Sequence, residues 1–265
     1  MAIHTTEAIV LRRYPFRETS VTLSCLTDGF GKLKGLVKGL RAQPSRHRSA
    51  MEPCTVNRIV FYDTRTSQLH LVSQCELLDP LAGLQRDLDT ARLAALCVEL
   101  VDTVVPLEEP QPATYQLLKH TLERLSLGGA ELQAVRAHFI LRLLRLAGFQ
   151  PQLDQCAGCN TLVHGAGYWS AKQGGLLCPR CLHEDPNAEP ASPEALDALE
   201  RLSESEQPPT LDTGLLPGLR QRLDNFLYWR LDRPLRTLGA LGSGLGARTT
   251  NAFDPEPRAP SPEPA

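Results

Sequence analysis

Apolar and polar positions alternate along the first third of the chain, in short runs that turn signals separate. Residues 21–25 and 69–72 show the alternation clearly, and a period of two indicates strands that bury one face. Asp28-Gly29-Phe30-Gly31 predicts a tight hairpin between the second and third runs. We expect strands over residues 7–13, 21–27, 32–38, 55–62 and 69–77. Five short strands so close in the chain favour a small closed or nearly closed barrel, most commonly an OB-fold.

From residue 87 onward, the apolar period is that of a helix. Apolar stripes predict helices from residue 89 to Pro106, from Pro112 to Gly128 and over 131–147, then a short helix from Ser192 and another from Leu219 to Leu231. We expect these helices to pack as a bundle. The predicted fold class is therefore α+β, with an N-terminal five-stranded barrel followed by an α-helical bundle.

Four cysteines form two Cys-x-x-Cys pairs, Cys156 with Cys159 and Cys178 with Cys181, and eighteen residues separate the pairs. Two intervening residues let a knuckle turn direct both sulfurs to one side, and a second knuckle completes a tetrahedron of thiolates. We expect Gly158 to supply a positive φ for the first turn. Four sulfurs fill the coordination shell of zinc, so the pattern predicts one structural Zn²⁺ that stabilises a short, loop-rich module of the helical bundle.

Other interpretations of the cysteines stay open. The pairs are also compatible with two disulfides or a redox dithiol, although no strand-then-helix pattern flanks either one. His164 or His183 lies close enough in sequence to replace one cysteine as a ligand. The other four cysteines, Cys25, Cys54, Cys75 and Cys97, stand in apolar surroundings and are expected to be buried thiols.

The net charge of −2 conceals an uneven distribution. Residues 1–80 hold 11 Lys/Arg and 7 Asp/Glu, whereas residues 81–265 hold 17 and 23. Within residues 12–58 the counts are 10 and 3. A cationic N-terminal part in an acidic protein favours contact with a polyphosphate.

The third predicted strand carries lysines at a period of two, so we expect a row of ammonium groups on its outer face. Arginines of the following loop could extend this row into a track along a phosphate backbone, which binds without reading bases. The alternative is a solvated edge strand that lysines protect from aggregation. The candidate nucleic-acid contacts on the first strand, the third strand and the loop are Lys32, Lys34, Lys38, Arg41, Arg46, Arg48, Arg12 and Arg13.

Neither a membrane-spanning run nor a signal peptide is evident, and we expect a cytoplasmic protein. The expected organisation is an OB-fold domain that binds nucleic acid over residues 1–80, a helical domain over 81–150 and 187–240, an inserted zinc module over 151–186 and a flexible, proline-rich tail over 241–265.

Several motifs occur in a specific order. The first half of the chain contains Glu7-Ala8-Ile9-Val10-Leu11-Arg12-Arg13-Tyr14-Pro15, Arg17-Glu18-Thr19, Gly31-Lys32-Leu33 and Lys38-Gly39. Gly148-Phe149-Gln150-Pro151-Gln152-Leu153 precedes the first cysteine pair, and Gly174-Gly175 precedes the second. Each motif is modest, but together they extend from residue 7 to about residue 236. In these motifs the sequence resembles the RecO family of recombination mediator proteins in bacterial DNA repair.

The resemblance implies an OB-fold, a helical domain and a zinc-bearing module, and no covalent catalysis. It also implies binding to single- and double-stranded DNA, annealing of complementary strands, recognition of single-strand-binding protein, and association with RecR to help load RecA. The protein would then act at the nucleoid. The resemblance supplies no role for the tail.

Two other functions remain open. A zinc enzyme acting on nucleic acid needs an open metal position with a base beside it, whereas this chain has a fourth cysteine and lacks the His-x-Glu motif of deaminases. A protein-only adaptor, with an incidental basic end, would bind partners and have no affinity for bare oligonucleotides.

Overall fold

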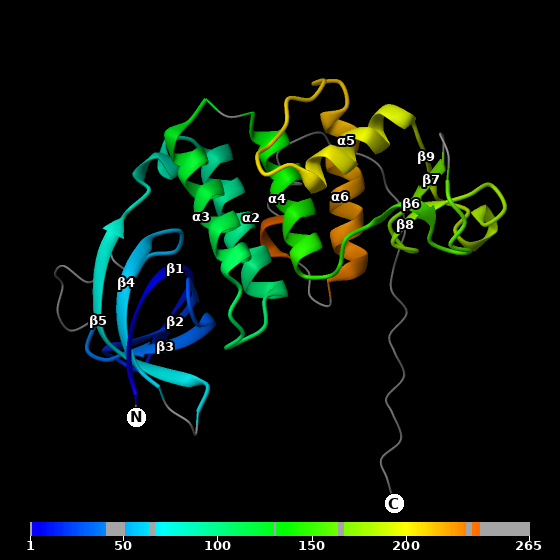
Figure 1. The fold of residues 1–265 in the computed structure, drawn as a ribbon. Helices are drawn as coiled ribbons and strands as arrows, with labels where there is room; N and C mark the ends of the chain where they lie inside the picture. The colour runs from blue at the N-terminus through cyan, green and yellow to red at the C-terminus, as the bar shows by residue number, and fades with distance from the viewer. Residues whose placement is uncertain are drawn as a thin grey trace, which may run out of the picture.

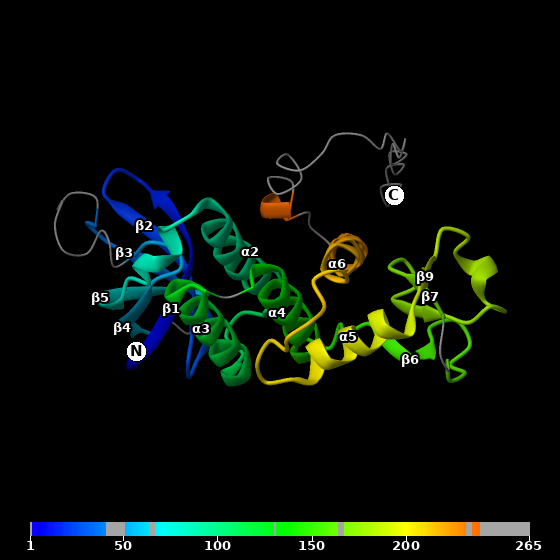
Figure 2. The ribbon, with the colours of Figure 1, turned by 90° about the horizontal axis from the view of Figure 1, so that it is seen from above.

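The computed structural model describes residues 2–40, 51–63, 67–129, 131–163, 167–231 and 235–238. Four residues named above, Arg41, Arg46, Arg48 and His164, lie outside these ranges, as does the segment 241–265. Figure 1 shows a barrel at one end, helices in the middle and a small sheet at the other end. The same order is visible from above in Figure 2.

Five strands close into a barrel in the order β1-β2-β3-β5-β4. Their bounds are β1 (Ile3–Phe16), β2 (Ser20–Thr27), β3 (Gly31–Val37), β4 (Val56–Tyr62) and β5 (Leu69–Asp79). Only β3 and β5 pair in parallel, and the other four pairs are antiparallel. The predicted five-stranded OB-fold barrel is confirmed.

Strand β1 buries both faces, because it lies between the barrel interior and the helices. Ala8 and Val10 belong to the core inside the barrel, whereas Ile9 and Leu11 belong to the core that the helices form. The register with β2 shifts between Val10 and Arg12, and such a bulge bends the strand. The apolar run of β1 therefore lies in the contact between the barrel and the helices. This contact between the barrel and the helices is called the seam below.

The barrel interior also buries the two residues that flank the segment 41–50. Leu40 and Met51 both belong to the barrel core. The chain therefore leaves the barrel at one buried apolar side chain and returns at another.

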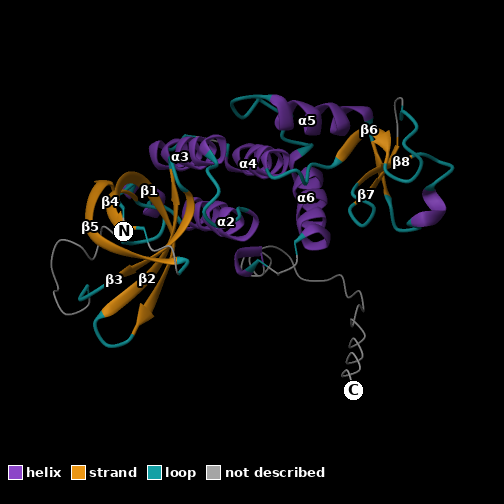
Figure 3. Cartoon of the chain, turned by 60° about the horizontal axis from the view of Figure 1, so that its bottom comes forward, coloured by secondary structure: helices purple, strands orange, loops and turns teal. Residues whose placement is uncertain are grey.

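The named helices that follow the barrel in the described ranges are the 3-10 helix η1 (Ala82–Gln85) and the α-helices α2 (Leu88–Val104), α3 (Pro112–Leu127), α4 (Leu132–Leu146), α5 (Pro193–Glu204) and α6 (Leu216–Arg230). The predicted bundle is confirmed, as Figure 3 shows. Ser192 caps α5 by accepting a hydrogen bond from the Ala195 amide, and Asp87 caps α2 in the same way through Thr90. None of the helices in the described ranges is both long and apolar enough to cross a membrane.

A four-stranded sheet lies between α4 and α5 in the chain, in the order β6-β8-β7-β9. It comprises β6 (Gln152–Cys156), β7 (Gly167–Ser170), β8 (Gly175–Leu177) and β9 (Glu189–Ala191), with a 3-10 helix η2 (Leu182–Glu184). The buried Trp169 ring packs on Phe226 of α6 at a centroid distance of 5.7 Å. Trp169 thus attaches the sheet to the helices, whereas Trp229 is 50% exposed.

The hairpin between β2 and β3 packs directly against the loop that joins α2 to α3. Gly31 has a φ of +70°, and a Cβ atom there would lie 2.0 Å from the carbonyl oxygen of Glu109. The Glu108 amide donates a hydrogen bond of 2.9 Å to the carbonyl of Lys32. A side chain at position 31 would therefore force the two backbones apart.

We expect Gly31→Ala to lower the free energy of unfolding by at least about 1–2 kcal/mol, because alanine is strained at positive φ and would collide with Glu109. Gly29→Ala is the matched control in the same hairpin, because its Cβ would meet nothing within 4 Å. Its effect should stay within about 0.5 kcal/mol. Urea unfolding of both variants measures the difference, and equal midpoints would contradict the packing described.

Candidate functional site

Helix α2 covers one part of the predicted lysine row and leaves the other part exposed. Lys32 is buried, at 8% exposure, and its Nζ donates a hydrogen bond of 2.6 Å to the backbone carbonyl of Asp102. Lys34 and Lys38 are exposed. The expectation that all three ammonium groups lie on the outside is therefore wrong for Lys32. The two-residue period of the strand correctly places the lysines on one face, but α2 covers the first part of that face.

Asp102 is the centre of the contact between α2 and the barrel. Its carboxylate accepts a hydrogen bond of 2.6 Å from Ser24 Oγ and forms an ion pair with Arg12, whose Nε lies 2.6 Å away. Burial lowers the pKa of Lys32, although the neighbouring Asp102 opposes the shift. Burial would also lower the pKa of Arg12, but its hydrogen bond with Tyr14 and the charge of Asp102 raise it overall. Arg12 and Lys32 are thus directed at the helix.

Glu99, one turn earlier on α2, connects the barrel to residues 235–238. Its carboxylate accepts hydrogen bonds from the Arg236 amide at 3.1 Å and from the Thr237 amide at 2.9 Å, and Arg12 lies 3.5 Å away. Burial acts to raise the pKa of Glu99, but the hydrogen bonds from Thr237 and Arg236 outweigh it and lower the pKa. Both carboxylates of this turn therefore have partners within the chain.

A second polar contact joins β1 to α3. The Glu7 carboxylate accepts hydrogen bonds from Tyr115 Oη at 2.5 Å and Lys119 Nζ at 2.6 Å. Burial acts to raise the pKa of Glu7, but these two hydrogen bonds lower it overall. The carboxylate therefore stays ionised within the seam, where its two partners stabilise the charge.

Arg13, the remaining first-strand candidate, forms an ion pair with Glu52. Among the described candidates, only the ammonium groups of Lys34 and Lys38 are both exposed and without a paired carboxylate in the described ranges. The structure therefore leaves two of the five described candidates available to an external anion.

The four cysteines converge at the far end of the molecule, on the edge of the small sheet. Their sulfur atoms all lie within 4.8 Å of one another, and the Sγ atoms of Cys159 and Cys178 are 3.8 Å apart. Thiolates about 2.3 Å from a zinc ion in a tetrahedron have edges of about 3.8 Å. All eight cysteines of the chain are described and are free thiols. The group of Cys156, Cys159, Cys178 and Cys181 can therefore hold a metal ion.

The first knuckle turns at Asn160. Asn160 has a φ of 56°, whereas Gly158 is not in the left-handed region, so the conformational role expected for this glycine is wrong. A Cβ at position 158 would lie 2.6 Å from Glu184 Oε1, at the end of a flexible side chain that can move aside. Hydrogen bonds with Thr161 lower the pKa of Cys159 to about 6, which favours the thiolate that metals bind.

Of the two histidine alternatives, only His183 lies within the described residues, and His164 lies outside them. His183 lies beside Arg180, with Nδ1 at 2.8 Å from that residue's carbonyl oxygen, and is exposed. Of the remaining cysteines, Cys25 and Cys97 are buried as expected, whereas Cys54 and Cys75 are only partly buried. Burial raises the pKa of all four thiols, to about 12 for Cys54 and Cys75.

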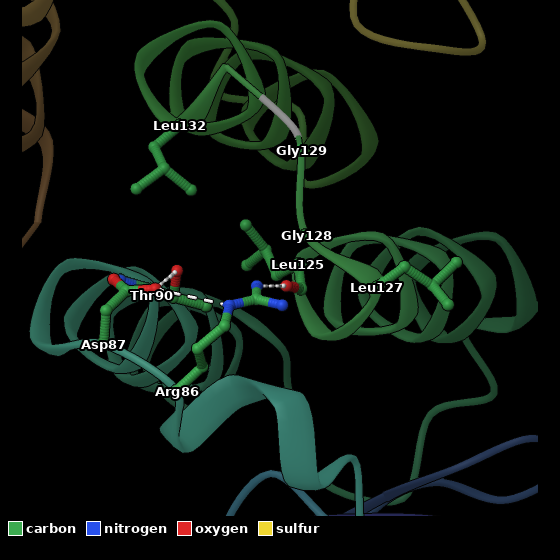
Figure 4. Close-up of a pocket in the computed structure, with 8 residues that line it drawn as sticks. All are labelled: Arg86, Asp87, Thr90, Leu125, Leu127, Gly128, Gly129 and Leu132. Atoms are coloured by element: carbon green, nitrogen blue, oxygen red, sulfur yellow. Dashed lines mark hydrogen bonds and ion pairs between the residues drawn. The ribbon is translucent and has the colours of Figure 1, made fainter.

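A small pocket of about 320 Å³ lies between the start of α2 and the junction of α3 with α4, as Figure 4 shows. The Arg86 guanidinium reaches across it and donates a hydrogen bond of 3.4 Å to the Leu125 carbonyl. Arg86 Nε also lies 3.7 Å from Asp87, which caps α2. The charged groups of this pocket therefore have partners within the pocket, and their role is structural.

Comparison with known proteins identifies the family. The model described as Recombination protein O N terminal matches residues 1–81, and the model described as Recombination protein O C terminal matches residues 85–239. The chain belongs to the RecO family. The boundary between the two matches coincides with the change from β5 to η1.

Relatives named DNA repair protein RecO support the assignment. The chain is 34% identical to that of Desulforudis audaxviator over 77% of this chain and 80% of the relative. It is 31% identical to that of Bifidobacterium animalis subsp. lactis over 91% of this chain and the whole relative. It is 29% identical to that of Pelotomaculum thermopropionicum over 91% of this chain and 94% of the relative. The match to RecO proteins thus covers the barrel, the helices and the cysteine sheet.

Residues of the motifs that resemble the RecO family lie at the contacts between the three parts of the chain. Gly31 and Lys32 pack the barrel against α2 and its following loop. Gly174 has a φ of +93°, and a Cβ there would lie 1.5 Å from Arg230 Nη2 of α6. Sequence reasoning missed Asp102 and Glu99 as partners, because nothing in a helical stripe shows which strand it covers.

Lys32 and Lys34 form a matched pair for testing this description. We expect Lys32→Ala to lower the free energy of unfolding by about 1.5–3 kcal/mol, because a hydrogen bond from a charged donor is lost inside the seam. Lys34→Ala should change it by no more than about 0.5 kcal/mol. Urea unfolding measures both, and an equal response of the two variants would contradict the burial of Lys32.

Proposed function

We propose that this chain is a mediator of homologous recombination and DNA repair. It binds single- and double-stranded DNA, anneals complementary strands and, with RecR, helps load RecA on DNA covered by single-strand-binding protein. Membership of the RecO family supports the proposal, since the relatives compared are named DNA repair proteins. The observation in this chain that carries it is the cationic surface that begins where β3 leaves the cover of α2.

That surface belongs to a stretch without acidic residues. Residues 29–51 contain six Lys/Arg and no Asp or Glu. Lys32 is used inside the seam, which leaves five cations for external phosphates: Lys34, Lys38, Arg41, Arg46 and Arg48. Arg12 and Arg13 make a smaller contribution in this proposal than the sequence suggested, because both face carboxylates.

Contacts of this kind neutralise phosphates and carry little sequence information. Annealing follows physically, because a cationic surface reduces the repulsion between two strands held close together while base pairing supplies the free energy. We assign residues 1–80 as the nucleic-acid-binding unit. No covalent step is needed, and the four-cysteine set leaves a bound metal without an open position for catalysis.

For the cysteine group we propose one structural Zn²⁺, held by Cys156, Cys159, Cys178 and Cys181. The spacing of the sulfur atoms and the lowered pKa of Cys159 support it. A bound ion would stabilise the loops around β6 to β8, which bury only a small core of their own around Leu177. Figures 1 and 2 show this sheet at the opposite end of the molecule from the barrel, so the metal is assigned no contact with DNA at the barrel.

The salt dependence of binding tests the DNA proposal. Five neutralised phosphates on a single strand give a log-log slope of about −3.5, and Lys34→Gln with Lys38→Gln should reduce it to about −2.1. Lys172→Gln, an exposed lysine after β7, is the control and should leave the slope unchanged. Fluorescence anisotropy over a salt series measures the slopes. An affinity that does not depend on salt would contradict the proposal, and no affinity at all would favour the protein-only adaptor.

Metal content tests the zinc proposal. The purified chain should contain about one zinc ion, and Cys178→Ser should reduce the content to near zero because one ligand is lost. Cys75→Ser, outside the group, is the matched control and should keep the metal. Chelation should expose residues 151–186 to proteases and leave single-strand binding by the barrel intact. Stoichiometric zinc in Cys178→Ser would contradict this ligand set.

A further inference from the structure

A cleft of about 1020 Å³ separates the outer face of the barrel from the helices. It is bounded by β1, β2 and β3 on one side and by α2, the segment after α4 and the end of α6 on the other. Pockets that bury a drug-sized ligand measure about 300–1,000 Å³. The cleft therefore has room for an extended ligand.

The two carboxylates that line the cleft have partners within the chain. Asp102 forms an ion pair with Arg12 and accepts a hydrogen bond from Ser24, and Glu99 accepts hydrogen bonds from the amides of residues 236 and 237. On the rim, Lys34 is exposed on the barrel side, and the side chains of Arg230 and Arg236 are exposed on the helical side. Five cationic side chains and two carboxylates line the cleft, so it suits an anionic ligand that crosses it.

Two exposed aromatic rings also line the cleft, one from each side. Tyr14 on β1 is 45% exposed, and Phe149 after α4 is 47% exposed. The Tyr14 hydroxyl accepts a hydrogen bond of 3.3 Å from Arg12, and the Phe149 amide donates one of 2.8 Å to the Leu144 carbonyl. The Tyr14 side chain is thus held by Arg12, the Phe149 backbone is fixed at the end of α4, and both residues are largely exposed.

We propose that this cleft binds an unpaired segment of single-stranded DNA, with bases stacked on Tyr14 and Phe149 and phosphates near Lys34, Arg230 and Arg236. The inference rests on the proposed DNA binding and extends it to a second surface. Aromatic stacking beside a cationic groove is how proteins hold single strands without reading sequence. A duplex keeps its bases paired and stacked, so it cannot use the two rings.

The test compares single and double strands on the full chain. Affinities for a labelled oligothymidine and for a duplex of the same length are measured by anisotropy for Tyr14→Ala and Phe149→Ala. Each variant should bind the single strand about 10-fold or more weakly, with the duplex affinity changed less than about twofold. Tyr228→Ala is the matched control, because Tyr228 is 70% exposed on α6 and does not line the cleft. It should bind like the unchanged chain.

Two further measurements separate stacking from a structural effect. Tyr14→Phe keeps the ring and removes the hydroxyl, so single-strand affinity should be retained. An oligonucleotide carrying 5-iodouracil should cross-link to peptides that contain Tyr14 or Phe149. Retained affinity with such cross-links supports the cleft, whereas loss of affinity in Tyr14→Phe overturns the stacking role.

The remaining outcomes distinguish this inference from the function on which it rests. Unchanged single-strand affinity in both alanine variants, or an equal loss for single strand and duplex, overturns the cleft while a salt-dependent affinity still supports DNA binding by the barrel. An unchanged chain that binds neither nucleic acid overturns both proposals. Tight binding of free inorganic phosphate that competes with the oligonucleotide, with no effect of either ring, would identify a simple anion site instead.

Discussion

The polar contacts that one turn of α2 makes to the barrel determine which lysines of β3 remain exposed. The Asp102 carboxylate forms an ion pair with Arg12 and accepts a hydrogen bond from Ser24, and the Asp102 backbone carbonyl accepts one from Lys32. Because the contact is polar and partly buried, loss of one partner leaves another charge in the seam without compensation, which is costly. The same contact covers Lys32, leaves Lys34 exposed and forms the floor of the cleft. The position of the barrel on the helices and the exposure of Lys34 are thus two results of a single interaction.

Much of the architecture was accessible from the sequence, because it depends on local periodicity. The alternation along β2 and the stripe from Leu93 to Val101 each bury a face that the pattern identifies. The cysteine group was accessible for a similar reason, since the spacing within each knuckle places two sulfurs together. Features that depend on contacts between distant segments were not. Lys32 shows this, since a helix distant in the sequence covers a side chain that the strand pattern placed on the outside.

Glycines at close contacts between segments show what the family motifs specify in this fold. Gly31 and Gly175 both leave room for a backbone carbonyl of another segment, from Glu109 and Gln152 respectively. A motif of this kind marks a close approach between elements, and it carries no information about a ligand by itself. The distinction explains why Gly31-Lys32-Leu33 was a sound indicator of the RecO family while its lysine was misassigned to a surface.

The burial of Leu40 and Met51 has a consequence for the segment between them. Both side chains lie in the barrel core, so folding of the barrel already brings the two ends of residues 41–50 together. Barrel packing therefore offsets the loop-closure entropy of residues 41–50, and this entropic cost is separate from that of any contact the segment makes.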